Sequence, residues 1–301
     1  MSSLREIKTR IASVRSTLQI TSAMKRIASA KLHHAQQTIA GMSPYQQTLH
    51  TMLNSLLSSD HAHAGSLLAP DGMAPDTLPV KADAEAPKRV VVVAFSSSAS
   101  LCGSFNANVV AHTEELLRQL QVNGYAHDDI DIYAVGRKIA DALCRHGYQL
   151  KDDCSSLADH PSYEGARQLA DNLLDDYQQG RVGAVLLVYN HYASNSRQPS
   201  CHERWLPLSL SSEATTATLS QIVEPSVPEL LDELLPRVLR LKVYTVLLDA
   251  HAAEHAARTV AMQIASDNAD KLLAELTLQY NKSRQQKITS EILDLVGGQQ
   301  R

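Results

Sequence analysis

The N-terminal segment carries a stripe of apolar positions spaced alternately three and four residues apart. The stripe consists of Leu4, Ile7, Ile11, Val14, Leu18, Thr21, Lys25, Ala28, Leu32, Ala35, Ile39 and Met42. A heptad stripe of this kind predicts a helix that supercoils against a second helix. Because Gly41 and Pro44 oppose a regular helix, the sequence predicts a kink or a break near Ser43.

Two members of the stripe are polar, namely Thr21 and Lys25. Beside them the apolar residues Ile20, Met24 and Ile27 form a neighbouring stripe. A plain two-stranded coil has no reason to expose three such side chains, so they predict contact with an additional partner. The alternative is a local shift in the register of the coil.

The C-terminal segment is predicted to supply the second helix. Ser226 and Glu229 have the spacing of a capping box, and Pro236 predicts a kink or a restart of the helix soon afterwards. Beyond Pro236, nothing breaks the helical pattern before Gly297 and Gly298. Alanines are frequent along this stretch and allow two helices to run close together. The two ends of the chain therefore predict an antiparallel coil.

Between these segments, short apolar runs alternate with amphipathic stretches. Strands are predicted at 90–95, 131–135 and 184–189, and helices at 106–121, 136–146 and 163–179. This order predicts a mainly parallel sheet with right-handed crossovers. The predicted fold class is α/β, with a long antiparallel coiled coil of the N- and C-terminal helices and an inserted Rossmann-like α/β domain.

The sequence divides into four predicted parts. They are an N-terminal coiled-coil helix (1–58), a flexible connection (59–88), an α/β domain (89–210) and a C-terminal coiled-coil helix (211–301). The connection is predicted from its prolines and glycines and its lack of a period. His61 and His63 lie within it, two residues apart, and are interpreted as part of a solvent-exposed loop.

Composition and charge refine this picture. Aromatic residues make up only 4% of the chain, which favours packing of helices through small aliphatic side chains. The net charge is −4, but Glu6 is the only acid before residue 60, among seven lysines and arginines. This basic segment predicts an acidic partner, which could be protein, nucleic acid or membrane, or else a solvated helix face. No apolar run is long enough to span a membrane, and the N-terminus does not have the pattern of a secretory signal.

Candidate chemistry is weak throughout. The chain has no GxxxxGK[ST] loop, and the turn 96–103 lacks the glycines of a dinucleotide-binding loop. Cys102 in that turn is interpreted as a packed thiol, and the four cysteines as buried and reduced. His251 and His255 flank Glu254, but the acid is not where a zinc-binding HExxH motif needs it. We therefore expect no catalytic residue, cofactor or metal ligand.

Long motifs at both ends resemble one family. The segments 4–11, 20–32, 254–258 with Met262, 276–285 and 288–292 resemble the first and last helices of the gamma subunit of bacterial F-type ATP synthases. The turn Leu101-Cys102-Gly103 is also similar, although Ser98-Ala99-Ser100 replaces the usual Asp-Arg-Gly before it. The resemblance is dense at the ends and weaker in the middle of the chain.

The resemblance implies a rotor shaft without chemistry of its own. Such a shaft turns inside a ring of alpha and beta subunits, rests on the c-ring and carries an epsilon subunit. It couples ion flow through the c-ring to ATP synthesis at the beta subunits. The expected complex is proton-translocating, although the choice between H⁺ and Na⁺ lies in the c subunits. The chain is expected at the cytoplasmic face of the bacterial inner membrane, as a peripheral protein that contacts the membrane only through the c-ring.

The resemblance also implies contact residues. Met24, Lys25 and Arg26 would face the acidic lever segment of a beta subunit. Arg284, Gln285, Thr289 and Glu291 would contact beta-subunit loops near the top of the shaft. Ile288, Ile292 and Val296 would form an apolar tip within the ring. The alternative for the second group is an ordinary solvated helix surface.

Two other classes of function are compatible with parts of the sequence. The α/β domain could belong to a small-molecule transferase with helical dimerisation arms. The basic segment could bind the phosphates of a nucleic acid, in which case binding would depend strongly on salt. Neither class explains the C-terminal pattern between Arg284 and Glu291, so no nucleic-acid partner is expected.

Overall fold

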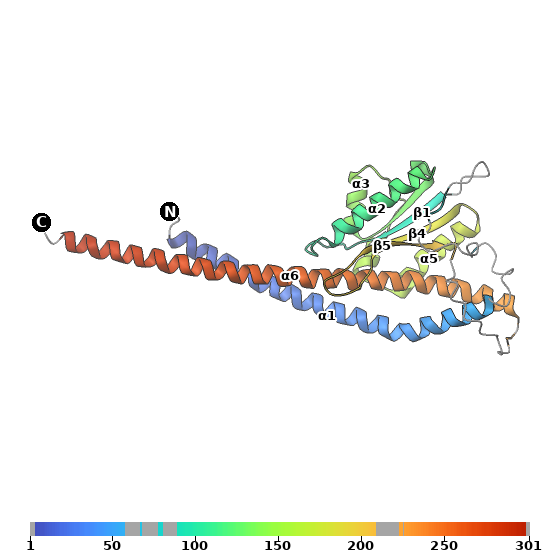
Figure 1. The fold of residues 1–301 in the computed structure, drawn as a ribbon, viewed down its shortest axis with the longest axis horizontal. Coiled ribbons are helices and arrows are strands. Elements are labelled where there is room, and N and C mark those ends of the chain that lie inside the picture. The colour runs from blue at the N-terminus through green and yellow to red at the C-terminus, as the bar shows by residue number, and fades with distance from the viewer. Residues whose placement is uncertain are drawn as a thin grey trace. The chain divides into compact units, whose positions relative to one another are not determined.

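A computed structural model describes residues 4–57, 67, 78–80, 89–208, 223–224 and 226–298, without the side chains of 57 and 294–298. Its elements are α1 (Leu4–Leu57), β1 (Arg89–Phe95), α2 (Phe105–Val122), η3 (His127–Asp129), β2 (Ile130–Val135), α3 (Arg137–Arg145), β3 (Asp152–Asp153), α4 (Ser155–Asp159), α5 (Tyr163–Gln178), β4 (Val182–Asn190), β5 (Ser200–Leu206) and α6 (Val227–Gly298) (Figure 1). The chain divides into two compact units. We call 1–30 with 258–301 the coil unit, and 31–257 the α/β unit.

The α/β unit contains one five-stranded sheet in the order β3-β2-β1-β4-β5. Strands β1, β2, β3 and β4 run parallel, and β5 pairs antiparallel with β4. The three predicted strands and the three predicted helices of this region are confirmed, as is the mainly parallel sheet. The sequence did not predict the edge strands β3 and β5, because neither is a continuous apolar run.

Helices cover both faces of this sheet (Figure 1). On one face, α2 and α3 pack against alternate residues of β1, such as Val90 and Val92. On the other face, α5 and the part of α6 around Val243 pack against Val91 and Val93. Because both faces are covered, the central strands are apolar throughout. Part of α6 therefore belongs to the core of the α/β unit.

Within the α/β unit, α1 packs against α6 through leucines. Leu49, Leu53 and Leu56 of α1 form one cluster with Leu231 and neighbouring residues of α6. Helix α1 runs unbroken through Gly41 and Pro44, so the predicted break is wrong. A proline removes one backbone donor, and the leucine packing just beyond Pro44 holds the helix in spite of that loss. The kink remains a prediction.

The start of α6 follows its prediction. Ser226 Oγ accepts a hydrogen bond from the backbone N–H of Glu229 at 3.5 Å, which confirms the predicted N-cap. Helix α6 continues through Pro236 without a restart. The cysteines are free, but Cys144 is exposed at the end of α3, so the prediction of burial is wrong there. Its place in the last turn of an outer helix explains the exposure.

The division of the chain into four parts stays a prediction. Most of the connection 59–88, including His61 and His63, lies outside the described residues, as do residues 211–222 of the predicted C-terminal helix. Within the described ranges, no helix combines the length and the apolar character that crossing a bilayer requires.

Candidate functional site

In the coil unit, α1 and α6 run antiparallel and are joined by polar pairs. The hydroxyls of Thr21 and Ser266 lie 2.9 Å apart and are buried. Four residues after Thr21, Lys25 Nζ donates a hydrogen bond to Oε1 of Gln263, which lies three residues before Ser266. The two helices therefore run in opposite directions. Ala28 is also buried, which means that the heptad stripe continues through its two polar members. The alternative of a register shift is therefore wrong.

The neighbouring apolar stripe of α1 is exposed. Ile20 and Ile27 each expose 60% of their surface, and Met24 between them is half-buried. Helix α6 adds Ile264 and Leu278, which the sequence reasoning missed. The sequence could have indicated these two, because both lie off the stripe of α6 that faces the coil interface. That stripe consists of the buried Met262, Ser266, Ala269 and Leu276 and the half-buried Leu273. The coil unit thus carries apolar side chains outside its own interface.

The structure separates the first group of predicted contact residues. Arg26 is exposed, while Met24 and Lys25 are half-buried. Lys25 points across the coil interface and donates a hydrogen bond to Gln263 Oε1. Gln263 Nε2 in turn donates to Asp267 Oδ1 at 2.7 Å. No pattern in the sequence indicated this pairing. An incoming partner would therefore meet Arg26 directly and Lys25 as a group already engaged within the coil.

The second and third groups lie beyond the coil interface. On α6, Leu276 is buried and Ser283 is half-buried, whereas every side chain from 284 to 293 is exposed. This stretch includes Arg284, Gln285, Thr289, Glu291, Ile288 and Ile292. Thr289 Oγ1 donates to its own helix at Gln285 O, and Glu291 pairs with Lys287 at 3.8 Å. The side chain of Val296 lies outside the described residues.

This exposed end of α6 carries both apolar and charged side chains. Ile288 and Ile292 expose 46% and 55% of their surface, and Leu293, which the sequence reasoning did not name, exposes 64%. Arg284 and Glu291 offer charges on the same ten-residue stretch. Apolar side chains so exposed on a helix without a neighbour are typical of a surface that another molecule covers.

The α/β unit has the usual place for a ligand, at the carboxyl ends of β1 and β4 where the strand order reverses. The polar side chains at this edge bond to their own loops. Ser97 Oγ donates to Ala99 O at 2.6 Å, and Asn190 Nδ2 donates to Phe105 O at 2.9 Å. Cys102 is 1% exposed, which confirms the packed thiol.

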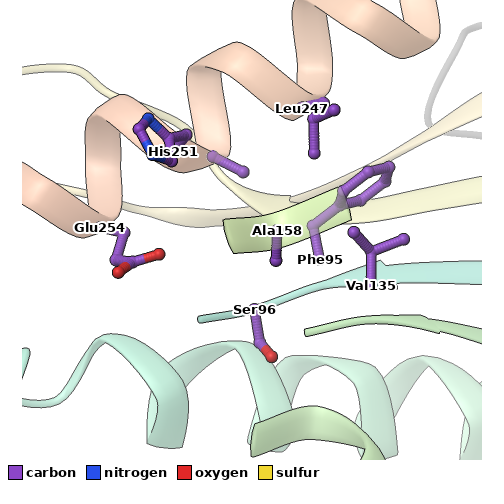
Figure 2. A pocket seen from close by; sticks show the side chains of 8 residues that line it. Phe95, Ser96, Val135, Ala158, Leu247, His251 and Glu254 are labelled. Atoms are coloured by element: carbon purple, nitrogen blue, oxygen red, sulfur yellow. The ribbon is translucent and has the colours of Figure 1, made fainter. Parts of the chain in front are cut away.

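Helix α6 covers the remaining space at this edge. Figure 2 shows Leu247, His251 and Glu254 projecting from α6 toward Phe95, Ser96 and Val135 at the strand ends. The pocket between them measures about 10 Å³, which is about the room of one water molecule. Ser96 Oγ accepts from the backbone N–H of Ile139 at 3.0 Å. This pocket is far smaller than the roughly 300–1,000 Å³ of typical small-molecule sites.

Two histidines of α6 lie next to this pocket. The Nε2 atoms of His251 and His255 are 3.1 Å apart, and their rings meet edge to face. The part of the chain that the structure describes has no group of three or more His, Cys, Asp or Glu side chains placed to hold a metal. The thiols of Cys154 and Cys201 are not nucleophile candidates, because burial raises their pKa to about 12 and about 11.

Comparison with known proteins decides the family. The family model described as ATP synthase matches residues 3–300. The ATP synthase gamma chain of Phocaeicola vulgatus is 45% identical over 302 residues, covering 99% of both chains, and that of Bacteroides fragilis is 45% identical over 306 residues with the same coverage. The chain belongs to the ATP synthase gamma chain family. These relatives are bacterial, as the resemblance implied.

Solved structures agree with the fold of this gamma chain. A chain in the Euglena gracilis mitochondrial ATP synthase, in a structure of OSCP, F1 and the c-ring, matches with a TM-score of 0.62 and 17% identity. The match covers 98% of this gamma chain and 92% of that one. This match confirms the predicted fold class, and the relatives confirm the predicted gamma chain family. The roles of the contact residues in this gamma chain stay predictions.

Proposed function

We propose that this gamma chain is a non-catalytic rotor shaft that drives the beta subunits through the exposed end of its C-terminal helix. Its proposed partners are the alpha, beta and epsilon subunits and the c-ring. Rotation driven by ion flow, which we propose is a flow of protons, would present this asymmetric surface to each beta subunit in turn. The three catalytic sites would then occupy different states. The proposed location is the cytoplasmic face of the inner membrane, as a peripheral protein.

The observation that carries the proposal is the exposure of residues 284–293 on a helix that has left its coil partner. Ile288 and Ile292 supply an apolar surface, and Arg284 and Glu291 supply charges that would orient the contact with a beta subunit. A rotating shaft needs contacts that form and break repeatedly. Exposed charges give weak contacts of this kind, because each is largely solvated when the contact is broken. Arg26 and the Ile20/Ile27 stripe supply a second such surface on α1.

The small size of the pocket at the carboxyl edge of the sheet supports a non-catalytic role. The carboxyl edge of the sheet is covered by α6, and its pocket holds no more than water. The polar groups of the edge are used in loop contacts such as that between Asn190 and Phe105. The transferase alternative needs an open cleft at this edge, and α6 occupies that space.

The test uses the gamma chain co-expressed with the host's alpha and beta subunits. The variant combines Arg284→Ala, Gln285→Ala and Glu291→Ala. We expect it to co-purify with beta but to lose about tenfold in steady-state ATP hydrolysis, equivalent to about 1.4 kcal/mol of lost coupling. The fold of the chain should not change, because all three side chains are exposed.

The control changes Gln286→Ala and Ser290→Ala, which are exposed on the same turns but were not predicted as contacts. This control should hydrolyse ATP within twofold of the unmodified complex. Equal activities of the two variants would contradict the proposed role of the C-terminal end. Failure of the unmodified chain to form any complex with alpha and beta would contradict the shaft itself.

A further inference from the structure

A pair of histidines joins α2 to the edge strand β5 of the α/β unit. His112 Nε2 and His202 Nδ1 lie 3.1 Å apart, and the two ring centroids are 5.2 Å apart. Both side chains are half-buried, so solvent reaches the pair. The two residues are 90 positions apart in the sequence, and only the fold brings them together. The proposed function makes no use of this pair.

The surroundings of His112 favour its neutral form. Burial and the nearby His202 lower the pKa of His112, against a smaller opposite effect of Glu115. The carboxylate of Glu115 is itself engaged by Arg118 and Gln119. Between the two facing ring nitrogens there is room for one hydrogen, so one nitrogen donates and the other accepts. Neutral imidazole is also the form of histidine that binds a metal ion.

Other histidine contacts of the α/β unit differ from this pair. His146 and His191 each have a ring nitrogen engaged by a carboxylate. The Nε2 atoms of His251 and His255 are also 3.1 Å apart, but His255 is only 4% exposed and the pocket beside them holds about one water molecule. A metal ion held by two protein ligands also needs room for water ligands. His112 and His202 combine two facing nitrogens with access to solvent.

We propose that His112 and His202 bind a divalent transition-metal ion such as Zn²⁺, with water in its remaining coordination positions. Two imidazole nitrogens at the usual Zn–N distance in a tetrahedral site lie about 3.3 Å apart, close to the observed 3.1 Å. The ion replaces the hydrogen between the rings. Each imidazole then carries its one N–H on the outer nitrogen, which is Nδ1 of His112 and Nε2 of His202. Imidazole suits Zn²⁺, Ni²⁺ and Cu²⁺, whereas Mg²⁺ prefers oxygen ligands.

Two protein ligands make this ion exchangeable. Within the described ranges, no third His, Cys, Asp or Glu is placed to close the site, whereas a structural zinc site takes four protein ligands. Because α2 and β5 each contribute one ligand, the bound ion ties the edge strand to a helix that packs on the sheet. It therefore stabilises this side of the α/β unit as the concentration of the metal rises. The site is remote in sequence from 284–293, and the proposal does not depend on the rotor role.

The first experiment titrates Zn²⁺ into the purified full chain, produced without a histidine tag. By isothermal titration calorimetry we expect one saturable Zn²⁺ site per chain, and no comparable site for Mg²⁺. His112→Asn and His202→Asn should each weaken Zn²⁺ binding at least tenfold, since loss of a group that only supports a metal ligand already costs about tenfold or more. The matched control is His146→Asn, which removes an exposed histidine at the end of α3 and should leave the affinity within about twofold.

Several results of this titration would overturn the proposal. One is the absence of saturable Zn²⁺ binding. Another is weak binding shared equally by all variants, because it would mean adventitious binding to surface histidines. A third is loss of the site in a variant with His61→Asn and His63→Asn while His112→Asn keeps it, because the ion would then lie elsewhere in the chain.

The second experiment locates the ion by amide hydrogen exchange of the full chain, with and without Zn²⁺. We expect exchange to slow at least about threefold in α2 around His112 and in β5 around His202, and to stay unchanged in α5 on the other face of the sheet. His112→Asn and His202→Asn should each abolish this protection. Matching thermal unfolding midpoints of the variants without metal show that they fold, and His202→Gln provides a second variant at that position. Protection confined to other segments, or unchanged by these substitutions, overturns the proposal even where the shaft function holds.

Discussion

The same two helices pack together in both units, but with different chemistry. In the α/β unit, α1 and α6 meet through buried leucines such as Leu53 and Leu231, each fully shielded from solvent. In the coil unit they meet through polar pairs such as Thr21 with Ser266, while Ile20 and Ile27 stay exposed. Where the two helices meet, the α/β unit therefore buries leucines, whereas the coil unit buries a polar pair beside exposed isoleucines. The difference fits our proposal that the coil unit is the end that contacts partners.

The largest effect is expected in the α/β unit, at Gly136. Its φ is +116°, and an added Cβ would lie 2.3 Å from Ser96 O. Gly136→Ala therefore adds backbone strain to a steric clash and should cost about 3–5 kcal/mol of unfolding free energy. Urea unfolding of the isolated chain measures the loss. This would show how far the α/β unit depends on tight contacts at the strand ends.

The control for Gly136 is Gly147→Ala. Gly147 also has a positive φ, of +86°, but nothing lies within 4 Å of the position of an added Cβ. Backbone strain alone should cost about 1–2 kcal/mol. Similar losses for the two variants would contradict the steric part of the explanation.

The next effect compares the two helix interfaces directly. Leu53→Ala removes a fully buried side chain in the α/β unit and should cost about 2–5 kcal/mol, because it leaves a cavity. Ile11→Ala removes a half-buried side chain in the coil unit and should cost about 1 kcal/mol. Amide hydrogen exchange measures the loss in each unit separately. Equal losses in both would contradict the contrast between an anchored end and a contact end.

The sequence predicted the parts of the fold that rest on local pattern. The run Val90–Phe95 is apolar throughout because the strand is covered on both faces, and that alone identified it. Strand β5 escaped prediction because His202, Glu203 and Arg204 interrupt it, as an edge strand allows. Helix α1 passes Pro44 because leucine packing outweighs the missing donor, which is a tertiary effect that no local pattern shows.

In the candidate site, too, the sequence predicted what a local pattern shows and missed what depends on tertiary structure. The heptad stripe predicted a partner helix, but only the three-dimensional register shows that Lys25 meets Gln263. The predicted contact residues between Arg284 and Glu291 came from family resemblance, since an exposed helix end has no periodic signature of its own. The groove lined by Tyr45, Tyr163 and Tyr244 brings together residues from three helices far apart in sequence, so no motif could have indicated it.

The smallest effect concerns the polar pair of the coil unit. Thr21→Val leaves the buried hydroxyl of Ser266 without its partner and should cost about 1 kcal/mol. Ser266→Ala should cost less, because Thr21 Oγ1 still donates to Leu18 O at 3.1 Å. The double variant should cost less than the sum of the two, because no buried hydroxyl is then left unpaired. Hydrogen exchange in the coil unit measures all three variants.

The control is Thr17→Val, whose exposed hydroxyl donates to its own helix at Ser13 O. It should change stability by less than about 0.5 kcal/mol. Strict additivity would mean that the two hydroxyls do not depend on each other, which would contradict the explanation.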